Sequence, residues 1–185
     1  LATAWPDLRV TLTSVTDQWA GIAVSGPASR DLLRAVVDDI DVSNEALPHL
    51  GVTRGTLRDI PVMIARLSFS GERAYEVYAP AHFGEQLWTI LLEAGAPLDV
   101  VPYGVEALGT LRIEKGHVAG AELDGRTTLG DLGLDGLASK KKDFIGKAMM
   151  GREGLVRPDR LCLVGLESVD GQPVRIGAHL VESSD

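Results

Sequence analysis

Glu76 and Tyr78 are the residues of this sequence whose types and spacing best suit the binding of a ligand. They lie in the segment 74–79, which follows the polar turn Ser70–Gly71–Glu72 and has the pattern of a β-strand. Because side chains alternate across a strand, the Glu76 carboxylate and the Tyr78 ring are expected on the same face. A carboxylate beside an aromatic ring would form one wall of a pocket. The alternative interpretation is a solvated strand face, with Glu76 exposed and Tyr78 an ordinary aromatic residue of a sheet.

The generic motifs of metal and nucleophilic chemistry are missing from the sequence. None of its four histidines has a second histidine or cysteine three or four positions away, so no metal site is predicted. Cys162 stands within the apolar run 161–164, which predicts a buried, inert thiol rather than a nucleophile. The sequence contains neither a G-x-S-x-G nucleophile motif nor a phosphate-binding glycine loop that precedes a helix.

Several strands and helices are predicted around these residues. Expected strands, from β-rich composition and alternation, are the stretches 10–14, 19–25, 56–67 and 74–79. Helices are expected from about Pro27 onward, over 81–94 and from Tyr103–Gly104 onward, each with apolar residues at helical spacing. Asp143 is predicted to cap a short helix over 144–153. Strands are expected at 160–167 and 178–182. The interleaving of strands and helices without strict alternation predicts an α+β fold.

Length, composition and charge limit the kinds of partner. The 185 residues carry 18 basic and 26 acidic side chains, and a net charge of −8 argues against a nucleic-acid partner. No run approaches the roughly 18 apolar residues of a membrane helix. The single cysteine fits a reducing compartment, so we expect a cytoplasmic protein. Leu1 stands where a methionine would begin a complete chain, and we therefore expect a piece of a longer polypeptide.

Four motifs in a fixed order resemble the tetrahydrofolate-dependent aminomethyltransferase family, typified by the T-protein of the glycine cleavage system. They are Ser70–Gly71–Glu72, Tyr75–Glu76–Val77, the segment 111–116 (LRIEKG) and the segment 142–147 (KDFIGK). The segments 5–10 (WPDLRV) and 12–16 (LTSVT) and the triple lysine 140–142 are similar to the α subunit of heterotetrameric sarcosine oxidase. The resemblance covers essentially the whole chain.

The resemblance implies a fold, a division of the chain and an activity. The fold would be a partial aminomethyltransferase fold, with a folate-binding region over 1–139 and the start of a C-terminal β-barrel-like unit over 140–185. The protein would be an enzyme, part of a sarcosine oxidase α subunit that accepts the one-carbon unit of oxidised sarcosine on tetrahydrofolate, giving 5,10-methylenetetrahydrofolate. The β, γ and δ subunits would be its partners, and flavin and NAD would belong to other regions or subunits. The family's catalytic aspartate would precede Leu1, so no catalytic residue is predicted here and the piece alone is expected to be inactive.

The resemblance also implies four residues that bind the folate: Glu76, Tyr78, Phe69 and Arg112. The family glutamate that binds the pterin maps onto Glu76, and one carboxylate can accept both of the adjacent N–H donors of a reduced pterin. Tyr78 could stack on the ligand or close the pocket. Phe69 replaces a family tyrosine. Arg112 could contact a folate carboxylate or form an intramolecular salt bridge.

Some positions leave the function open. Leu108 stands where the aminomethyltransferases carry an arginine, which favours the sarcosine oxidase branch. Lys140–Lys142 fit an anion contact for a polyglutamate tail, a contact with a partner subunit, or a solvated loop. The alternatives to the oxidase subunit are a free-standing aminomethyltransferase of the glycine cleavage type and a non-catalytic folate-binding assembly module.

Overall fold

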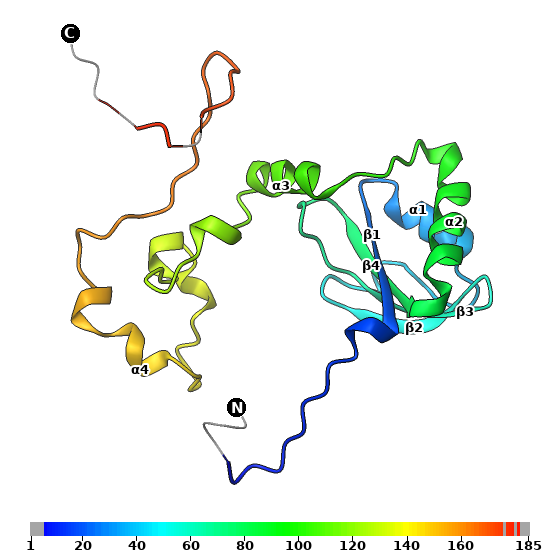
Figure 1. Ribbon diagram of the computed structural model, residues 1–185, viewed down its shortest axis with the longest axis horizontal. Helices are drawn as coiled ribbons and strands as arrows, with labels where there is room; N and C mark the ends of the chain where they lie inside the picture. Colours follow the sequence, from blue (N-terminus) through cyan, green and yellow to red (C-terminus); the bar gives the residue numbers. More distant parts are fainter. Residues whose placement is uncertain (1–5, 176, 180, 182–185) are drawn as a thin grey trace. The chain divides into compact units, whose positions relative to one another are not determined.

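The computed structural model describes residues 6–175, 177–179 and 181. The chain divides into two compact units, one up to His117 and one from Val118 onward. The first unit contains a four-stranded antiparallel sheet in the order β1-β4-β3-β2 (Figure 1). The strands are β1 (Trp19–Ser25), β2 (Val52–Leu57), β3 (Ile60–Ala65) and β4 (Ala74–Pro80). This mixed architecture confirms the predicted α+β class.

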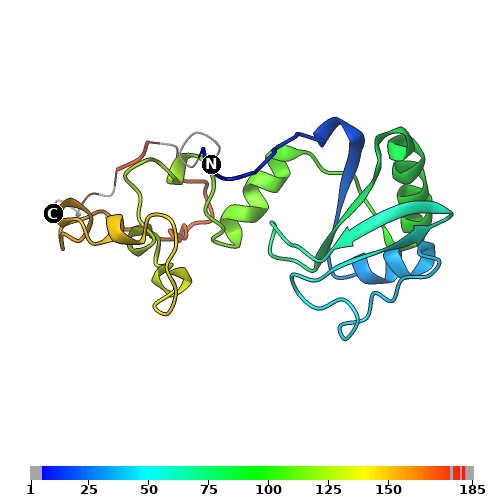
Figure 2. The ribbon, with the colours of Figure 1, turned by 90° about the horizontal axis from the view of Figure 1, so that it is seen from below.

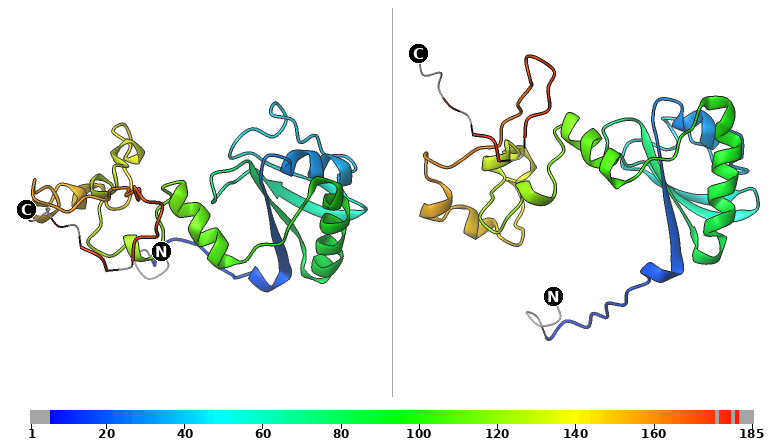
Figure 3. Two further views of the ribbon diagram at one scale, coloured as in Figure 1. Left: turned by 90° about the horizontal axis from the view of Figure 1, so that it is seen from above. Right: turned by 45° about the horizontal axis from the view of Figure 1, so that its top comes forward.

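Two helices cover one face of this sheet. They are α1 (Ser29–Val36) and α2 (Gly84–Gly95), and both lie against the same side of the strands in Figures 2 and 3. Their apolar faces and the inward residues of the strands form the core. Its most buried large side chains are Tyr75, Leu32, Leu33, Leu47, Leu57, Ile60, Ile64 and Leu87. The opposite side of the sheet is called the outer face below.

The prediction for the first unit holds for most elements. Strand 19–25, the helix after Pro27, the helix around 81–94 and the helix that opens at Gly104 are confirmed, the last as α3 (Val105–Glu114). The strand expected at 10–14 is wrong, because that segment has no strand structure. The single strand expected over 56–67 is wrong as well, because a tight turn at Arg58–Asp59 divides β2 from β3.

The turn between β2 and β3 contains neither glycine nor asparagine, the residues that would indicate it in the sequence. Arg58 and Asp59 both adopt left-handed backbone conformations, with φ of 47° and 64°. Such a turn ordinarily favours asparagine and glycine. Here distant groups stabilise it: Arg58 Nη2 donates to the carbonyl of Ala35 at 3.1 Å, and the Asp59 N–H donates to Asp38 Oδ2 at 2.9 Å. These contacts come from the end of α1 and the residues after it, so no local pattern could indicate them.

The second unit has short helical turns and α4 (Lys147–Met150), and the part of it that the structure describes holds no strand. The strand predicted at 160–167 is therefore wrong, and the start of a barrel-like unit is not seen within 140–175. Instead of pairing along a strand, Leu163 donates its N–H to the carbonyl of Asp131 at 2.7 Å. The segment 178–182 includes residues outside the described ones. Asp143 does not cap a helix, since α4 begins after Gly146, and it pairs with Lys147 Nζ at 3.1 Å.

An ion pair between Asp131 and Arg160 connects separate segments of the second unit. Arg160 Nε donates to Asp131 Oδ1 at 2.8 Å, Nη2 donates to the other carboxylate oxygen, and Nη1 donates to the carbonyl of Gly154 at 3.1 Å. Asp131 also accepts the Thr128 N–H at 2.7 Å. The guanidinium, followed by the Thr128 N–H, lowers the pKa of the Asp131 carboxyl well below its usual range.

We expect this pair to make the second unit sensitive to acid and to substitution of Arg160. Because the pKa is depressed in the folded state, the carboxylate contributes stability above about pH 4 and loses it as the pH falls further. Arg160→Met should raise the rate of limited proteolysis between residues 118 and 163 several-fold at pH 7. Arg157→Met is the matched control, because Arg157 pairs with Asp159 in a solvent-exposed position. Equal proteolysis rates for the two variants would contradict a structural role for the Asp131 pair.

Candidate functional site

Glu76 and Tyr78 form a hydrogen-bonded pair on the outer face of β4. The strand directs Tyr75, Val77 and Ala79 into the core, where each has an exposed fraction of 0%. Glu76 and Tyr78 alternate with them, point to the outer face and are half-buried. The Tyr78 hydroxyl donates to Glu76 Oε2. The predicted common face is therefore confirmed, and the two side chains are joined directly.

Small side chains flank this pair on the neighbouring strand. In the β1–β4 register, Gly21 lies opposite Tyr78 and Ala23 lies opposite Glu76, and both are exposed. A Cβ added to Gly21 would lie 2.9 Å from Cε1 of the Tyr78 ring and 3.1 Å from Cδ1. The ring therefore lies directly over the Gly21 backbone. The β1 side of the pair presents little side-chain volume, which leaves Glu76 accessible from that side.

The electrostatics of the pair keep Tyr78 a hydrogen-bond donor. The hydrogen bond to Glu76 raises the pKa of the Tyr78 phenol above its ordinary value near 10, and burial and the carboxylate charge raise it further. A phenolate beside a carboxylate would lose the hydrogen bond and repel its neighbour. The hydroxyl proton thus stays on Tyr78 and points at Glu76 throughout the physiological pH range.

This raised pKa is open to direct measurement. In an absorbance titration at alkaline pH, the change that the unmodified protein shows and Tyr78→Phe lacks belongs to Tyr78. The midpoint of that change should lie above the ordinary pKa range of tyrosine. Removing the acceptor with Glu76→Ala should bring the pKa of Tyr78 back down, because both the hydrogen bond and the charge are then gone. A Tyr78 that titrates at about pH 10 in the unmodified protein would contradict the pairing.

Phe69 and Arg112 lie together around His117 at the end of the first unit. The Phe69 and His117 ring centroids are 4.6 Å apart, with an angle of 52° between the planes. Arg112 Nη1 donates to the backbone carbonyl of His117 at 3.2 Å. Among the four predicted residues, Tyr78 thus contacts Glu76 directly, whereas Phe69 and Arg112 each contact His117. Part of the hydrogen-bonding capacity of Arg112 is therefore used within the chain, and its role toward a folate stays a prediction.

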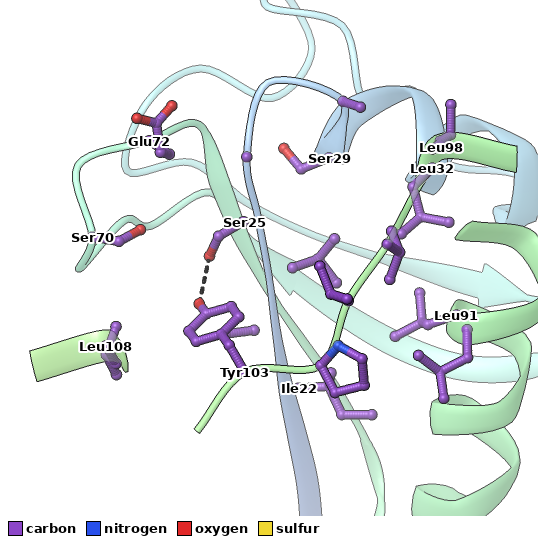
Figure 4. A pocket seen from close by; sticks show the side chains of 18 of the residues that line it. Ile22, Ser25, Ser29, Leu32, Ser70, Glu72, Leu91, Leu98, Tyr103 and Leu108 are labelled. Carbon is purple, nitrogen blue, oxygen red and sulfur yellow. Dashed lines mark hydrogen bonds between the residues drawn. The ribbon is translucent and has the colours of Figure 1, made fainter. Parts of the chain in front are cut away.

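A pocket of about 720 Å³ lies along β1 in the first unit, and sequence reasoning missed it (Figure 4). Ser25 and Tyr103 form a hydrogen bond of 3.0 Å between their hydroxyls at its polar end. Ser70 also lines this pocket, and its buried Oγ has no hydrogen-bond partner among the described residues. Side chains that line the rest include Ile22, Leu32, Leu91, Leu98 and Leu108. The Ser25–Tyr103 contact joins positions 78 residues apart, which no local motif could predict.

The structure also describes other side chains that the sequence singled out. No group of three or more metal-binding side chains occurs within the described part of the chain. Among the described residues, no helix is long and apolar enough to cross a membrane. The prediction of a buried thiol is wrong, because Cys162 is exposed where the expected strand does not form. Lys140–Lys142 are exposed, which fits each of the alternatives for them.

The first unit is therefore an antiparallel α+β unit with a hydrogen-bonded carboxylate and phenol on its outer sheet face. The comparison with known proteins then gives the family: the chain belongs to the GCVT N-terminal domain family, whose model matches residues 1–142. This confirms the resemblance seen in the ordered motifs.

Individual relatives agree with the family. The chain is 46% identical over 181 residues to the sarcosine oxidase subunit alpha of Rhizobium meliloti (strain 1021), covering 96% of this chain and 18% of that protein. The subunit alpha of Corynebacterium sp. (strain U-96) is 44% identical over 172 residues, again 18% of its length. The aminomethyltransferase of Koribacter versatilis (strain Ellin345) is 35% identical over 182 residues, 94% of this chain and 46% of that protein.

Proposed function

We propose that this chain supplies one wall of a tetrahydrofolate site in a protein of the sarcosine oxidase α-subunit type. The protein would be an enzyme that passes the one-carbon unit of oxidised sarcosine to tetrahydrofolate, yielding 5,10-methylenetetrahydrofolate. The observation that carries the proposal is the Glu76 carboxylate on the outer face of β4, fixed by Tyr78 and open toward Gly21 and Ala23. The identity of 46% to a sarcosine oxidase subunit alpha supports the assignment to that branch.

The residues present fit a reduced pterin. Its ring N–H and exocyclic amino group are adjacent donors, and a carboxylate is the side chain that accepts both with charge-assisted hydrogen bonds. Tyr78 donates to only one of the two carboxylate oxygens, and each oxygen retains lone pairs for a ligand. The exposed Gly21 and Ala23 leave room beside the carboxylate for a flat ring.

The task of these residues in the reaction is orientation. Tetrahydrofolate supplies the nitrogens that take up the one-carbon unit. Glu76 would accept the N–H donors of the pterin and so fix the ring in its plane, and Tyr78 would keep the carboxylate in the accepting orientation. Holding a reactant in the productive geometry lowers the barrier of a bimolecular step substantially. Phe69 and Arg112 are proposed to contact the remainder of the folate.

The other parts of the proposal concern the whole protein. The chain spans about a fifth of the length of the sarcosine oxidase relatives and under half of the aminomethyltransferase relative. Flavin and NAD are proposed to bind in other regions or subunits, and the β, γ and δ subunits are the proposed partners. No residue of this chain is proposed to be catalytic. The division at residue 139 stays a prediction, supported by a family match that ends at residue 142. The single cysteine favours the cytoplasm.

The test uses the full-length protein that the gene encodes and measures the product in which the one-carbon unit appears. While sarcosine is oxidised, added tetrahydrofolate should replace released formaldehyde by 5,10-methylenetetrahydrofolate, one for one. The control is free formaldehyde at the same concentration, which sets the rate of the uncatalysed reaction. Formaldehyde release that does not fall in the presence of tetrahydrofolate would overturn the proposal. Transfer from an aminomethylated lipoyl carrier protein would instead identify a free-standing aminomethyltransferase. Folate binding without any transfer of the one-carbon unit would identify an assembly module.

A further inference from the structure

We infer that Tyr78 is a positioning residue, which holds the Glu76 carboxylate in one orientation for its ligand, and that Gly21 is required because it admits the Tyr78 ring. The inference rests on the proposed function, since it concerns the same carboxylate. The site would then consist of a coupled pair rather than of one glutamate. It would also depend on a glycine of β1, which has no side chain to contact the ligand.

The first support is the geometry of β4. Glu76 and Tyr78 are two positions apart, so their side chains emerge on the same face of a strand. β4 pairs with β1 on one side and with β3 on the other, which fixes its backbone at both residues. A glutamate on a half-buried sheet surface would otherwise sample several rotamers. The hydrogen bond from Tyr78 selects one of them before any ligand arrives.

The second support is the donor and acceptor count of the pair. A tyrosine hydroxyl has one proton, and Tyr78 uses that proton on Glu76. Its oxygen can then act toward a ligand only as an acceptor, as the carboxylate does. The pair therefore presents acceptors alone on this part of the outer face, which selects ligand edges made of N–H donors, such as the 2-amino edge of a reduced pterin.

The third support is the space under the ring. Any side chain at Gly21 would place its Cβ 2.9 Å from Cε1 of Tyr78, closer than carbon atoms pack, and the ring would have to move. The neighbouring β4 backbone cannot move with it, because it is hydrogen-bonded on both sides. Displacing the ring would carry the hydroxyl away from Glu76. Gly21→Ala should therefore reproduce the effect of removing the hydroxyl.

The experiment is a double-mutant cycle on the protein as its gene encodes it, with folinate as the calorimetric probe. Tyr78→Phe should weaken folinate binding about five- to tenfold with Glu76 present, and less than about twofold in the Glu76→Ala background, because Tyr78 acts through Glu76. Gly21→Ala should give the same loss as Tyr78→Phe, with no further loss when the two are combined. The Glu76→Ala variants, which bind more weakly, are titrated at correspondingly higher folinate concentrations.

Two control variants separate positioning from general damage. Tyr75→Phe removes a hydroxyl from the core side of the same strand and should lower stability without changing folinate affinity. Gly136→Ala adds a Cβ at a glycine that has no heavy atom within 4 Å, and it should change neither property. The temperature of unfolding should be unchanged in Tyr78→Phe.

The outcomes distinguish this inference from the proposed function. If Glu76→Ala weakens binding and Tyr78→Phe does not, the positioning role is wrong and the folate site stands. An equal loss from Tyr78→Phe in both backgrounds would mean that Tyr78 contacts the ligand independently, which also overturns positioning. If Glu76→Ala leaves the affinity unchanged, the proposed function itself fails.

Discussion

Replacing Glu76 with alanine is expected to weaken the binding of tetrahydrofolate or folinate to the intact protein at least tenfold. A hydrogen bond to a charged group contributes about 1.5–3 kcal/mol, and two of them meet on this carboxylate in the proposed complex. Since about 1.4 kcal/mol corresponds to a factor of ten in affinity, the loss of one such bond already gives the predicted effect. Tyr78 would also lose its hydrogen-bond acceptor in this variant.

Two further variants make this result specific. Glu76→Gln keeps the shape of the side chain but replaces one acceptor oxygen by an N–H donor, which would face the N–H donors of the pterin, so a loss is expected here as well. Glu93→Ala removes an exposed glutamate from α2, on the helix-covered side of the sheet, and should bind folinate as the unmodified protein does. Equal affinities for Glu76→Ala and Glu93→Ala would exclude Glu76 from the site.

The second large effect is expected at Tyr75, on the core side of the same strand. Tyr75→Ala should lower the free energy of unfolding by about 3–5 kcal/mol, as for other large aromatic residues removed from a core. The side chain has an exposed fraction of 0%, and its hydroxyl accepts a hydrogen bond of 2.9 Å from Arg30 Nε. Arg30 is itself buried and also donates to Asn44 Oδ1 at 2.5 Å. The substitution therefore leaves a cavity and removes one acceptor from a buried guanidinium.

Tyr75→Phe separates these two contributions. It keeps the ring and removes only the acceptor for Arg30, so a smaller loss of roughly 1–3 kcal/mol is expected. The measurement is urea denaturation, followed by hydrogen exchange of the β4 amides. A Tyr75→Ala variant as stable as Tyr75→Phe would show that the ring contributes nothing to the core, against the packing described above.

Local sequence patterns predicted most of the first unit because its elements follow simple periodicities. The alternation in β4 correctly separated core residues such as Tyr75 from outer residues such as Glu76. The Arg58–Asp59 turn escaped prediction because its unusual backbone is stabilised by hydrogen bonds that it donates to Ala35 and Asp38. In the second unit, apolar residues after Arg160 have the composition of a strand, yet Arg160 is bound to Asp131 and the described residues offer that segment no strand partner.

The candidate site could also be predicted only in part, because local patterns specify neither side-chain rotamers nor contacts between distant residues. Alternation placed Glu76 and Tyr78 on one face, and the family resemblance gave the carboxylate a ligand. The hydrogen bond between the two side chains depends on their rotamers, which alternation does not specify. The position of Gly21 under the Tyr78 ring depends on the register between β1 and β4, which pairs residues far apart in the sequence. The pocket along β1 likewise depends on the return of the chain at Tyr103.

The most direct test of the central claim is a crystal structure of the intact protein with folinate bound. The 2-amino group and the adjacent ring N–H of the pterin should lie within hydrogen-bonding distance, about 2.7–3.2 Å, of the Glu76 carboxylate oxygens. The Tyr78 hydroxyl should still donate to that carboxylate, and its ring should stay over Gly21. A pterin bound elsewhere, with Glu76 facing solvent, would contradict the account.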